Sequence, residues 1–180
     1  MSDTIITDQE PFSKISNNLS NNSIIIPTVY IVAEHCGVAL KDYLITESAK
    51  IEINIIDLYP VNDPSDDYPT IAKILATQLK KDFDNRLNSI AIAMCGSGQG
   101  INMCLNRFYF VRSALISSQA LAVQARDHGN SNVITFGANY IENSEALKCL
   151  ISFVRTQPIA NSRHSNRVKM FSTQEYTRLD

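Results

Sequence analysis

The segment Ser89-Ile90-Ala91-Ile92-Ala93-Met94-Cys95-Gly96-Ser97-Gly98-Gln99-Gly100 contains an apolar run followed directly by a glycine-rich loop. The run predicts a strand over 89–94, and the residues after the loop predict a helix, so the glycines lie at a strand-to-helix junction. Glycine lets the backbone approach a ligand closely, and the first N–H groups of a helix lack intrahelical partners, so the junction favours anion binding. Cys95 and Ser97 place a thiol and a hydroxyl in this loop, where the helix terminus would favour a thiolate.

The rest of the chain alternates between strand-like and helix-like segments. Unbroken apolar runs are typical of strands covered on both faces, whereas the period-2 alternation of 51–57 indicates a strand nearer the sheet edge. The order predicts an α/β fold, a doubly wound, Rossmann-like three-layer sandwich with a five-stranded parallel sheet. Strands are predicted at 28–33, 51–57, 89–94, 111–116 and 133–136. Five helices are predicted between and after them: one at 38–45, one that begins at 68, a short one that follows the glycine-rich loop and ends near 106, one at 118–127, and one from 143 or 144 to about 156.

One domain is expected to cover most of the chain. The predicted domain spans residues 28–180 and ends in a closing helical segment, which follows Pro158 and the polar stretch 163–167. Residues 1–27 are predicted to be a disordered N-terminal extension, because the Ser- and Asn-rich part at 16–23 has almost nothing to bury.

Composition excludes several classes of function. The formal net charge is −2, so no basic excess exists to neutralise nucleic-acid phosphates or to bind an anionic membrane. No apolar run reaches the roughly 20 residues that a membrane-spanning helix needs, and the N-terminus does not resemble a secretory signal. We therefore expect a cytoplasmic protein with no nucleic-acid or membrane partner.

The cysteines form no C-x-x-C pair and no spacing suited to zinc. They are interpreted as reduced thiols, and no metal site is predicted. Taken alone, each is most often a small buried apolar residue, and Cys104 and Cys149 are assigned to helix faces in that role. The four are Cys36, Cys95, Cys104 and Cys149.

Polar residues follow the first three predicted strands at their carboxyl ends. Glu34-His35 follows the first strand, Tyr68 follows the loop after the second, and the segment 95–100 follows the third. Ligands of parallel sheets collect at this edge. His128 instead follows a helix and precedes the fifth strand, so it is expected at the opposite edge, and a second subunit would have to bring it to the others.

The glycine-rich loop alone does not identify a ligand. A dinucleotide fingerprint has a different glycine spacing and belongs on the first strand, and a P-loop would continue with Gly-Lys-Ser/Thr. A cysteine phosphatase would have an arginine six positions after the thiol, where this chain has Ile101. These three interpretations are excluded.

The chain from about Val29 to Met170 resembles the type-B ribose-5-phosphate isomerases, a family that also contains the galactose-6-phosphate isomerase subunits. The resemblance lies in six ordered segments and does not extend to the N-terminal extension. The segments are Glu34-His35-Cys36-Gly37 with Leu40-Lys41; Asp67-Tyr68-Pro69; Cys95 to Ile101 with Asn106; Arg112 with Arg126-Asp127-His128; Asn132-Val133 with Phe136-Gly137; and Arg163-His164 with Arg167-Val168.

The resemblance implies an aldose–ketose isomerisation without metal or organic cofactor. Cys95 would be the base that moves a proton between adjacent sugar carbons through an enediolate, and Ser97 with the loop amides would hold the oxyanion. His128 of a partner subunit would help to open the sugar ring. The implied substrate-binding residues are Glu34, His35, Tyr68, Gly96, Gly98, Gly100, Arg163 and Arg167, of which His35 and the two arginines would hold the phosphate.

The resemblance predicts a ribose-5-phosphate isomerase of the non-oxidative pentose phosphate pathway. A homodimer with shared active sites is implied, with pairing of dimers into a tetramer left open. Three positions depart from the family pattern: Glu34 replaces Asp, Gly129 replaces Asn and Asn139 replaces Arg. Two alternatives remain open, namely an isomerase for another sugar phosphate such as galactose 6-phosphate or allose 6-phosphate, and a non-catalytic sugar-phosphate-binding or structural subunit.

Overall fold

The computed structural model describes residues 27–61, 63–173 and 176. Within them, five strands form one parallel sheet in the order β2-β1-β3-β5-β4. The elements in chain order are β1 (Thr28–Ala33), the 3₁₀ turn η2 (His35–Gly37), α1 (Val38–Ala49), β2 (Ile55–Asp57), α2 (Tyr68–Asp84), β3 (Ser89–Cys95), α3 (Gln99–Leu105), β4 (Ser113–Leu115), α4 (Gln119–Asp127), β5 (Val133–Gly137), α5 (Asn143–Arg155) and α6 (Arg163–Phe171).

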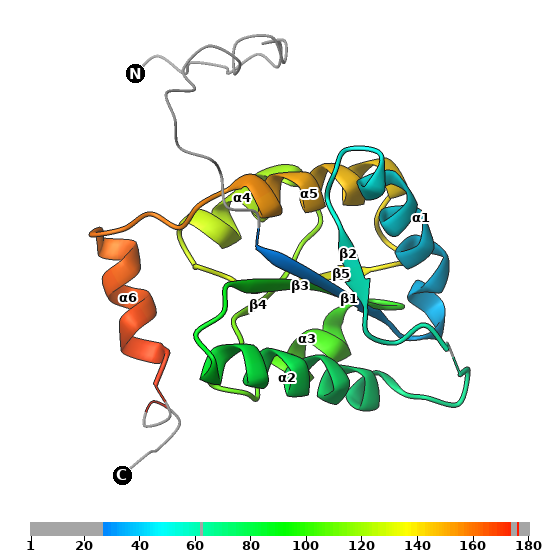
Figure 1. Ribbon diagram of the computed structural model, residues 1–180, viewed down its shortest axis with the longest axis horizontal. Helices are drawn as coiled ribbons and strands as arrows, with labels where there is room; N and C mark the ends of the chain where they lie inside the picture. The colour runs from blue at the N-terminus through cyan, green and yellow to red at the C-terminus, as the bar shows by residue number, and fades with distance from the viewer. Residues whose placement is uncertain (1–26, 62, 174–175, 177–180) are drawn as a thin grey trace, which may run out of the picture.

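Helices cover both faces of the sheet, as Figure 1 shows. Alternate residues of β1 face opposite layers, because side chains along a strand alternate between faces. Val29 and Ile31 belong to an apolar cluster that includes residues of α1, α4 and α5. Tyr30 and Val32 belong to a second cluster with residues of α2 and α3. The predicted three-layer α/β fold is therefore confirmed.

The centre of the sheet is aliphatic and fully buried. Ile31 of β1 pairs with Ile92 of β3, which pairs with Ile134 of β5, and all three have 0% exposure. Burying a side chain of this size stabilises a fold by about 1.5–3 kcal/mol, so this row contributes strongly to holding the three strands in register. Register matters for function, because it fixes the height at which each strand ends.

Several predicted boundaries were wrong. β2 begins at Ile55 rather than at 51, because the chain turns at Glu52 with a positive φ of 61°. β4 is limited to Ser113–Leu115, and the N-cap position of α5 is held by Glu142, without a side-chain hydrogen bond, rather than by Asn143 or Ser144. Residues 163–167 do not precede the closing helix but form its first turns. The edge position predicted for the second strand is confirmed, because β2 ends the sheet order.

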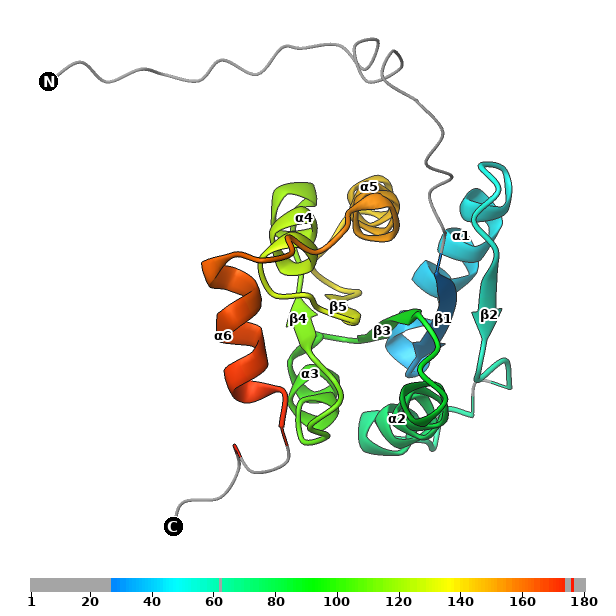
Figure 2. The same cartoon turned by 60° about the vertical axis from the view of Figure 1, so that its left-hand side comes forward.

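Helix α6 lies outside the two helical layers. Figure 2 shows it at the side of the sheet, next to the edge strand β4. Ser162 begins it with a capping box, in which the Ser162 Oγ accepts from the Ser165 N–H and the Ser165 hydroxyl accepts from the Ser162 N–H. Such reciprocal caps satisfy two helix-end donors and fix where the helix begins.

The prediction for the N-terminal extension falls outside the described residues, apart from Pro27. No helix in the described part of the chain is long and apolar enough to cross a membrane.

Candidate active site

The strand-to-helix junction has the geometry that its glycines predict. β3 ends at Cys95, and Gly98 precedes α3 with a φ of +75°, which is in the left-handed region. A β-carbon at Gly98 would lie 2.5 Å from Leu115 Cδ1 and 2.7 Å from the Gly137 nitrogen. Only glycine therefore fits without displacing the neighbouring strand ends.

A cavity of about 340 Å³ opens beside this loop, at the carboxyl edge of the sheet. Ser97 and Gln99 of the junction line it, together with the ends of β4 and β5 and the loop that follows β5. The Ser97 Oγ accepts a hydrogen bond from the Gln99 N–H at 3.3 Å. The Ser97 and Gly98 amide N–H groups donate to no residue that the structure describes. Ser97, with its hydroxyl and an unused N–H, is part of the cavity wall, and the unused N–H of the buried Gly98 lies directly behind it in the chain.

Cys95 lies where the third strand meets the glycine-rich loop, as predicted. Its side chain is less exposed than that of Ser97 in the loop. Its side chain is 4% exposed and packs in the apolar cluster under α2 and α3. Ser97, rather than Cys95, lines the cavity. A second thiol lies close by, because Cys36 Sγ is 3.6 Å from where a β-carbon at Gly96 would stand.

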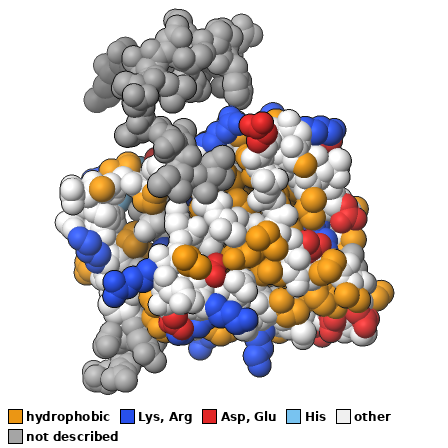
Figure 3. Space-filling view, in the orientation of Figure 1, with side chains coloured by type: hydrophobic (Ala, Val, Ile, Leu, Met, Phe, Trp, Pro, Cys, Tyr) orange, Lys and Arg blue, Asp and Glu red, His pale blue; other side chains and the backbone are white. Residues whose placement is uncertain are grey.

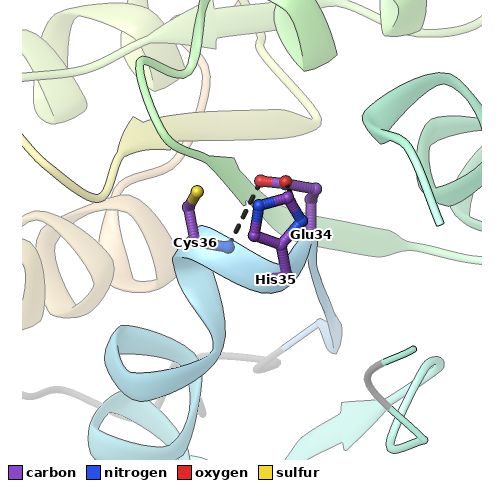
Figure 4. Close-up of side chains that lie close together, drawn as sticks. All are labelled: Glu34, His35 and Cys36. Carbon is purple, nitrogen blue, oxygen red and sulfur yellow. Dashed lines mark hydrogen bonds and ion pairs between the residues drawn. The ribbon is translucent and has the colours of Figure 1, made fainter. Parts of the chain in front are cut away.

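Glu34, His35 and Cys36 form a compact group at the end of β1. The Glu34 carboxylate pairs with His35 Nδ1 and accepts from the Cys36 N–H at 3.4 Å. Figure 4 shows the imidazole against the carboxylate. Their potential ligand atoms lie within 4.8 Å of one another, so this is the set that could hold a metal ion within the described ranges. Partial desolvation and the nearby Glu34 charge raise the pKa of the exposed Cys36 thiol, which favours its neutral form.

Tyr68 is placed against the junction by the start of α2. Its ring covers Gly100, where an added β-carbon would stand 2.6 Å from the ring Cζ. The side chain is 39% exposed, so the phenol remains accessible at this edge. The residues predicted to follow the first three strands are therefore brought to one side of the sheet.

His128 and the arginines of α6 form a separate group. His128, His164 and Arg167 line a second cavity of about 460 Å³ beside β4, which shares Leu115 and Ile116 with the first cavity. The two imidazole rings are stacked, with centroids 3.9 Å apart. Desolvation lowers the pKa of His164, and the charges of His128, Arg163 and Arg167 lower it further. Lys and Arg side chains lie over α6 at the left of Figure 3.

Comparison with known proteins gives one family. Residues 29–171 match the model of the Ribose/Galactose Isomerase family. The chain belongs to this family.

Among its relatives, the ribose-5-phosphate isomerase B of Mycobacterium tuberculosis is 31% identical over 150 residues, which are 83% of this chain and 90% of that protein. A crystal structure of the Mycoplasma genitalium ribose-5-phosphate isomerase B with bound ribulose-5-phosphate is 30% identical, with a TM-score of 0.75 over 84% of this chain and 97% of that one. The Anaplasma phagocytophilum enzyme is 28% identical, with a TM-score of 0.73 over 83% and 99%. The predicted family is confirmed.

Two residues that lie at these sites, His164 and Asn139, were not among the predicted site residues of this isomerase chain. His164 stacks on His128, and Asn139 Nδ2 lies 3.2 Å from where a β-carbon at Gly96 would stand. The first had a local signal, because His164 and Arg167 are three residues apart and share a helix face once Ser162 is recognised as a cap. The second had none, because Asn139 reaches the loop only through the pairing of β5 with β3.

Proposed function

We propose that this isomerase interconverts ribose 5-phosphate and ribulose 5-phosphate, the reaction named by its ribose-5-phosphate isomerase B relatives. The observation that supports this most directly is the junction itself, where Cys95 and Ser97 flank Gly96 at the end of β3 beside a 340 Å³ cavity. That volume suits a pentose phosphate. The reaction would place the protein in the non-oxidative branch of the pentose phosphate pathway.

Cys95 is the proposed base. Its thiolate takes the proton from C2 of the open-chain aldose, and the electron pair of that C–H bond forms the C1–C2 double bond of an enediolate. The π pair of the C1 carbonyl moves to O1, which takes up the proton that leaves the O2 hydroxyl. Return of the first proton from the thiol to C1, as the C2 carbonyl forms, gives the ketose, so no atom or electron is gained or lost. The position of Cys95 supports this role, because it ends β3 two residues before Ser97, which lines the cavity.

Ser97 and the loop amides are the proposed oxyanion donors. Unused N–H groups at Ser97 and Gly98 face no internal acceptor in the described structure, and the rigid left-handed turn at Gly98 fixes their direction. Preorganised donors contribute most where negative charge develops in the transition state, which here is the enediolate oxygen. Tyr68 and Glu34 are proposed to contact the sugar hydroxyls at the same edge.

A second copy of the chain is proposed to complete each site. His128 and Arg167 line the open cavity beside the edge strand β4, whereas Ser97 lines the first cavity, so one chain does not gather them in one cavity. In a homodimer, His128 of one subunit would assist ring opening in the other, and Arg163 and Arg167 with His35 would hold the phosphate by charge-assisted hydrogen bonds.

An assay with three substrates tests the proposal. Purified protein is given ribose 5-phosphate, galactose 6-phosphate or allose 6-phosphate, with and without chelator. We expect ribose 5-phosphate to give the highest kcat/KM and chelator to leave the rate unchanged. Preference for a hexose phosphate would show that the protein is an isomerase for another sugar phosphate. Failure to convert any of the three substrates would support a non-catalytic sugar-phosphate-binding or structural subunit. A strict metal requirement would contradict the thiol mechanism.

A further inference from the structure

Two arginines meet at the opposite end of the sheet from the candidate active site. Arg112 directly precedes β4, and Arg126 lies in the last turn of α4. Both line a cavity of about 220 Å³. Its polar wall also includes Asn88, Ser89, Asn130 and Asn132, which lie at or just before the amino ends of β3 and β5 or in the loop that leads to β5.

In the described ranges, the hydrogen-bond acceptors of both guanidinium groups are neutral. Arg126 is 5% exposed, and its Nη1 donates to the Asn130 Oδ1 at 3.0 Å and to the Ser131 carbonyl at 2.9 Å. Arg112 Nε donates to the Asn130 carbonyl at 2.7 Å. The Arg126 Nε is buried without a hydrogen-bond partner, and neither guanidinium forms an ion pair with a carboxylate of the described chain.

Among the residues that the structure describes, this arrangement has no counter-charge. Burial lowers the pKa of both groups, and the Arg112 charge contributes to lowering that of Arg126 to about 10. Both remain protonated at neutral pH, so two like charges share one small cavity. The Phe153 ring, 5.7 Å from Arg126 Cζ, gives a weak cation–π contact and no negative charge. Buried charges in proteins are almost always paired, because removing an unpaired ion from water is costly.

We propose that the Arg112–Arg126 cavity binds a small oxyanion of the phosphate class. A guanidinium presents a planar fork of N–H donors that matches the oxygens of such an anion, and two forks in one cavity would supply the missing negative charge with several charge-assisted hydrogen bonds. The cavity volume accommodates inorganic phosphate but not a large ligand. Asn130 and Ser131, which hold Arg126, lie in the loop directly after His128. The bound anion therefore also stabilises the loop that carries this imidazole.

Thermal unfolding of the full chain with inorganic phosphate tests the site. Two variants separate it from the substrate phosphate site. The double variant Arg163→Ala/Arg167→Ala removes the α6 cations, and Asn130→Asp places a carboxylate oxygen about where the Asn130 Oδ1 accepts from Arg126 at 3.0 Å. Aspartate tolerates the positive φ of 44° at this position. Asn54→Asp, at an exposed position without a side-chain hydrogen bond, adds the same charge elsewhere as a control.

Phosphate at about ten times its dissociation constant should raise the Tm of the wild type, of the double variant and of Asn54→Asp. The rise should be about 3–6 °C above the effect of sodium chloride at equal ionic strength. Asn130→Asp should unfold at a higher Tm without phosphate and should respond less than Asn54→Asp, and combining it with Arg163→Ala/Arg167→Ala should abolish the response. The proposal is wrong if Asn130→Asp responds like Asn54→Asp, or if the double variant abolishes the response, because phosphate would then act at α6.

A measurement on the unmodified protein covers the case in which Asn130→Asp does not fold. The Arg112 Nε–H is hydrogen-bonded to the Asn130 carbonyl, so its NMR signal is protected from exchange and can be followed during a phosphate titration. The signal should shift and saturate. An unchanged Arg112 signal at phosphate concentrations that shift the Arg163 signal would overturn the proposal. Neither experiment measures turnover, so failure here leaves the proposed isomerase activity untouched.

Discussion

The ring of Tyr68 covers Gly100, although the two residues lie on different helices. Tyr68 opens α2 and Gly100 is the second residue of α3, and a β-carbon at Gly100 would stand 2.6 Å from the ring Cζ and 2.7 Å from Cε2. The absence of a side chain at Gly100 therefore sets the height of the phenol above Ser97 and above the end of β3 at Cys95.

Replacing Gly100 with Ala should displace the Tyr68 ring and reduce kcat/KM for ribose 5-phosphate by about 10–100-fold, because a displacement of about 1 Å near the reacting atoms is costly. Stability should not fall, since Ala is the better helix residue and the displaced ring is an exposed, movable side chain. Steady-state kinetics with the Tm of each variant check this. Tyr68→Ala serves as the control, and similar kinetics in both variants would locate the effect in the ring.

Replacing Cys95 with Ala should lower kcat by about 10²–10⁴-fold, the range typical of a general base. Cys36→Ala is the matched control, because its thiol lies near the same loop but is exposed. Circular dichroism should show that both variants keep the fold. If Cys36→Ala loses activity while Cys95→Ala retains it, the assignment of the base is wrong.

The parts of this site that the sequence predicts are local ones. The glycines of 96–100 and the apolar run before them specify a strand, a turn and a helix start without help from distant residues, and this junction appears where it was expected. The strand order along the chain likewise predicts the parallel sheet and the edge at which Glu34 and Tyr68 gather. Strand lengths were less predictable, because β2 is shortened by the turn at Glu52, where an L residue adopts a positive φ.

Contacts between segments far apart in sequence could not be predicted. The stacking of His128 on His164 depends on how α6 returns to the end of α4, and the Arg112–Arg126 pair depends on the loop before β5. The spacing of His164 and Arg167 puts them on one face of α6 but does not show what that face contacts, and the Arg112–Arg126 pair has no periodic or motif signal. The sequence also gave Cys95 a loop position, whereas pairing with Gly137 extends β3 by one residue and buries the thiol.

Replacing Lys41 with Met should lower the free energy of unfolding by about 3 kcal/mol, because it leaves Asp57 without its buried partner. Lys41 is fully buried on α1, with its Nζ 2.8 Å from Asp57 Oδ2 and donating to the Tyr59 carbonyl at 2.8 Å. Urea denaturation measures the change. The double variant Lys41→Met/Asp57→Leu should recover part of the loss. No recovery would show that contacts of Lys41 other than the ion pair with Asp57 carry the stability.

Replacing Arg163 or Arg167 with Ala should raise KM for ribose 5-phosphate by about tenfold each, because each loses a charge-assisted hydrogen bond to the phosphate. Lys169→Ala, which removes a cation from the same helix, is the control and should change KM little. Unchanged KM values in both arginine variants would remove α6 from the phosphate site. Sedimentation should accompany the kinetics, because the proposed contact crosses between subunits.

His164 should make the folded state less stable in mild acid. Its pKa in the folded protein lies below the usual 6.5, because of desolvation and the positive charges of His128, Arg163 and Arg167. Below pH 6.5 the unfolded chain therefore binds a proton that the folded chain does not yet hold. The contribution of His164 to stability is present above pH 6.5 and is lost as the pH falls through the folded pKa. Urea denaturation from pH 7.5 to 5 should show this decline.

The variant His164→Gln should show a smaller decline over the same pH range, because glutamine does not titrate. The ring proton signal of His164, followed by NMR, should give a midpoint below 6.5 in the wild type. Saturating phosphate should raise that midpoint, since an anion bound by Arg163 and Arg167 would offset the charges that now oppose protonation. A midpoint that phosphate does not move would place the anion away from this imidazole, and an equal decline in stability in His164→Gln would assign the acid sensitivity to other groups.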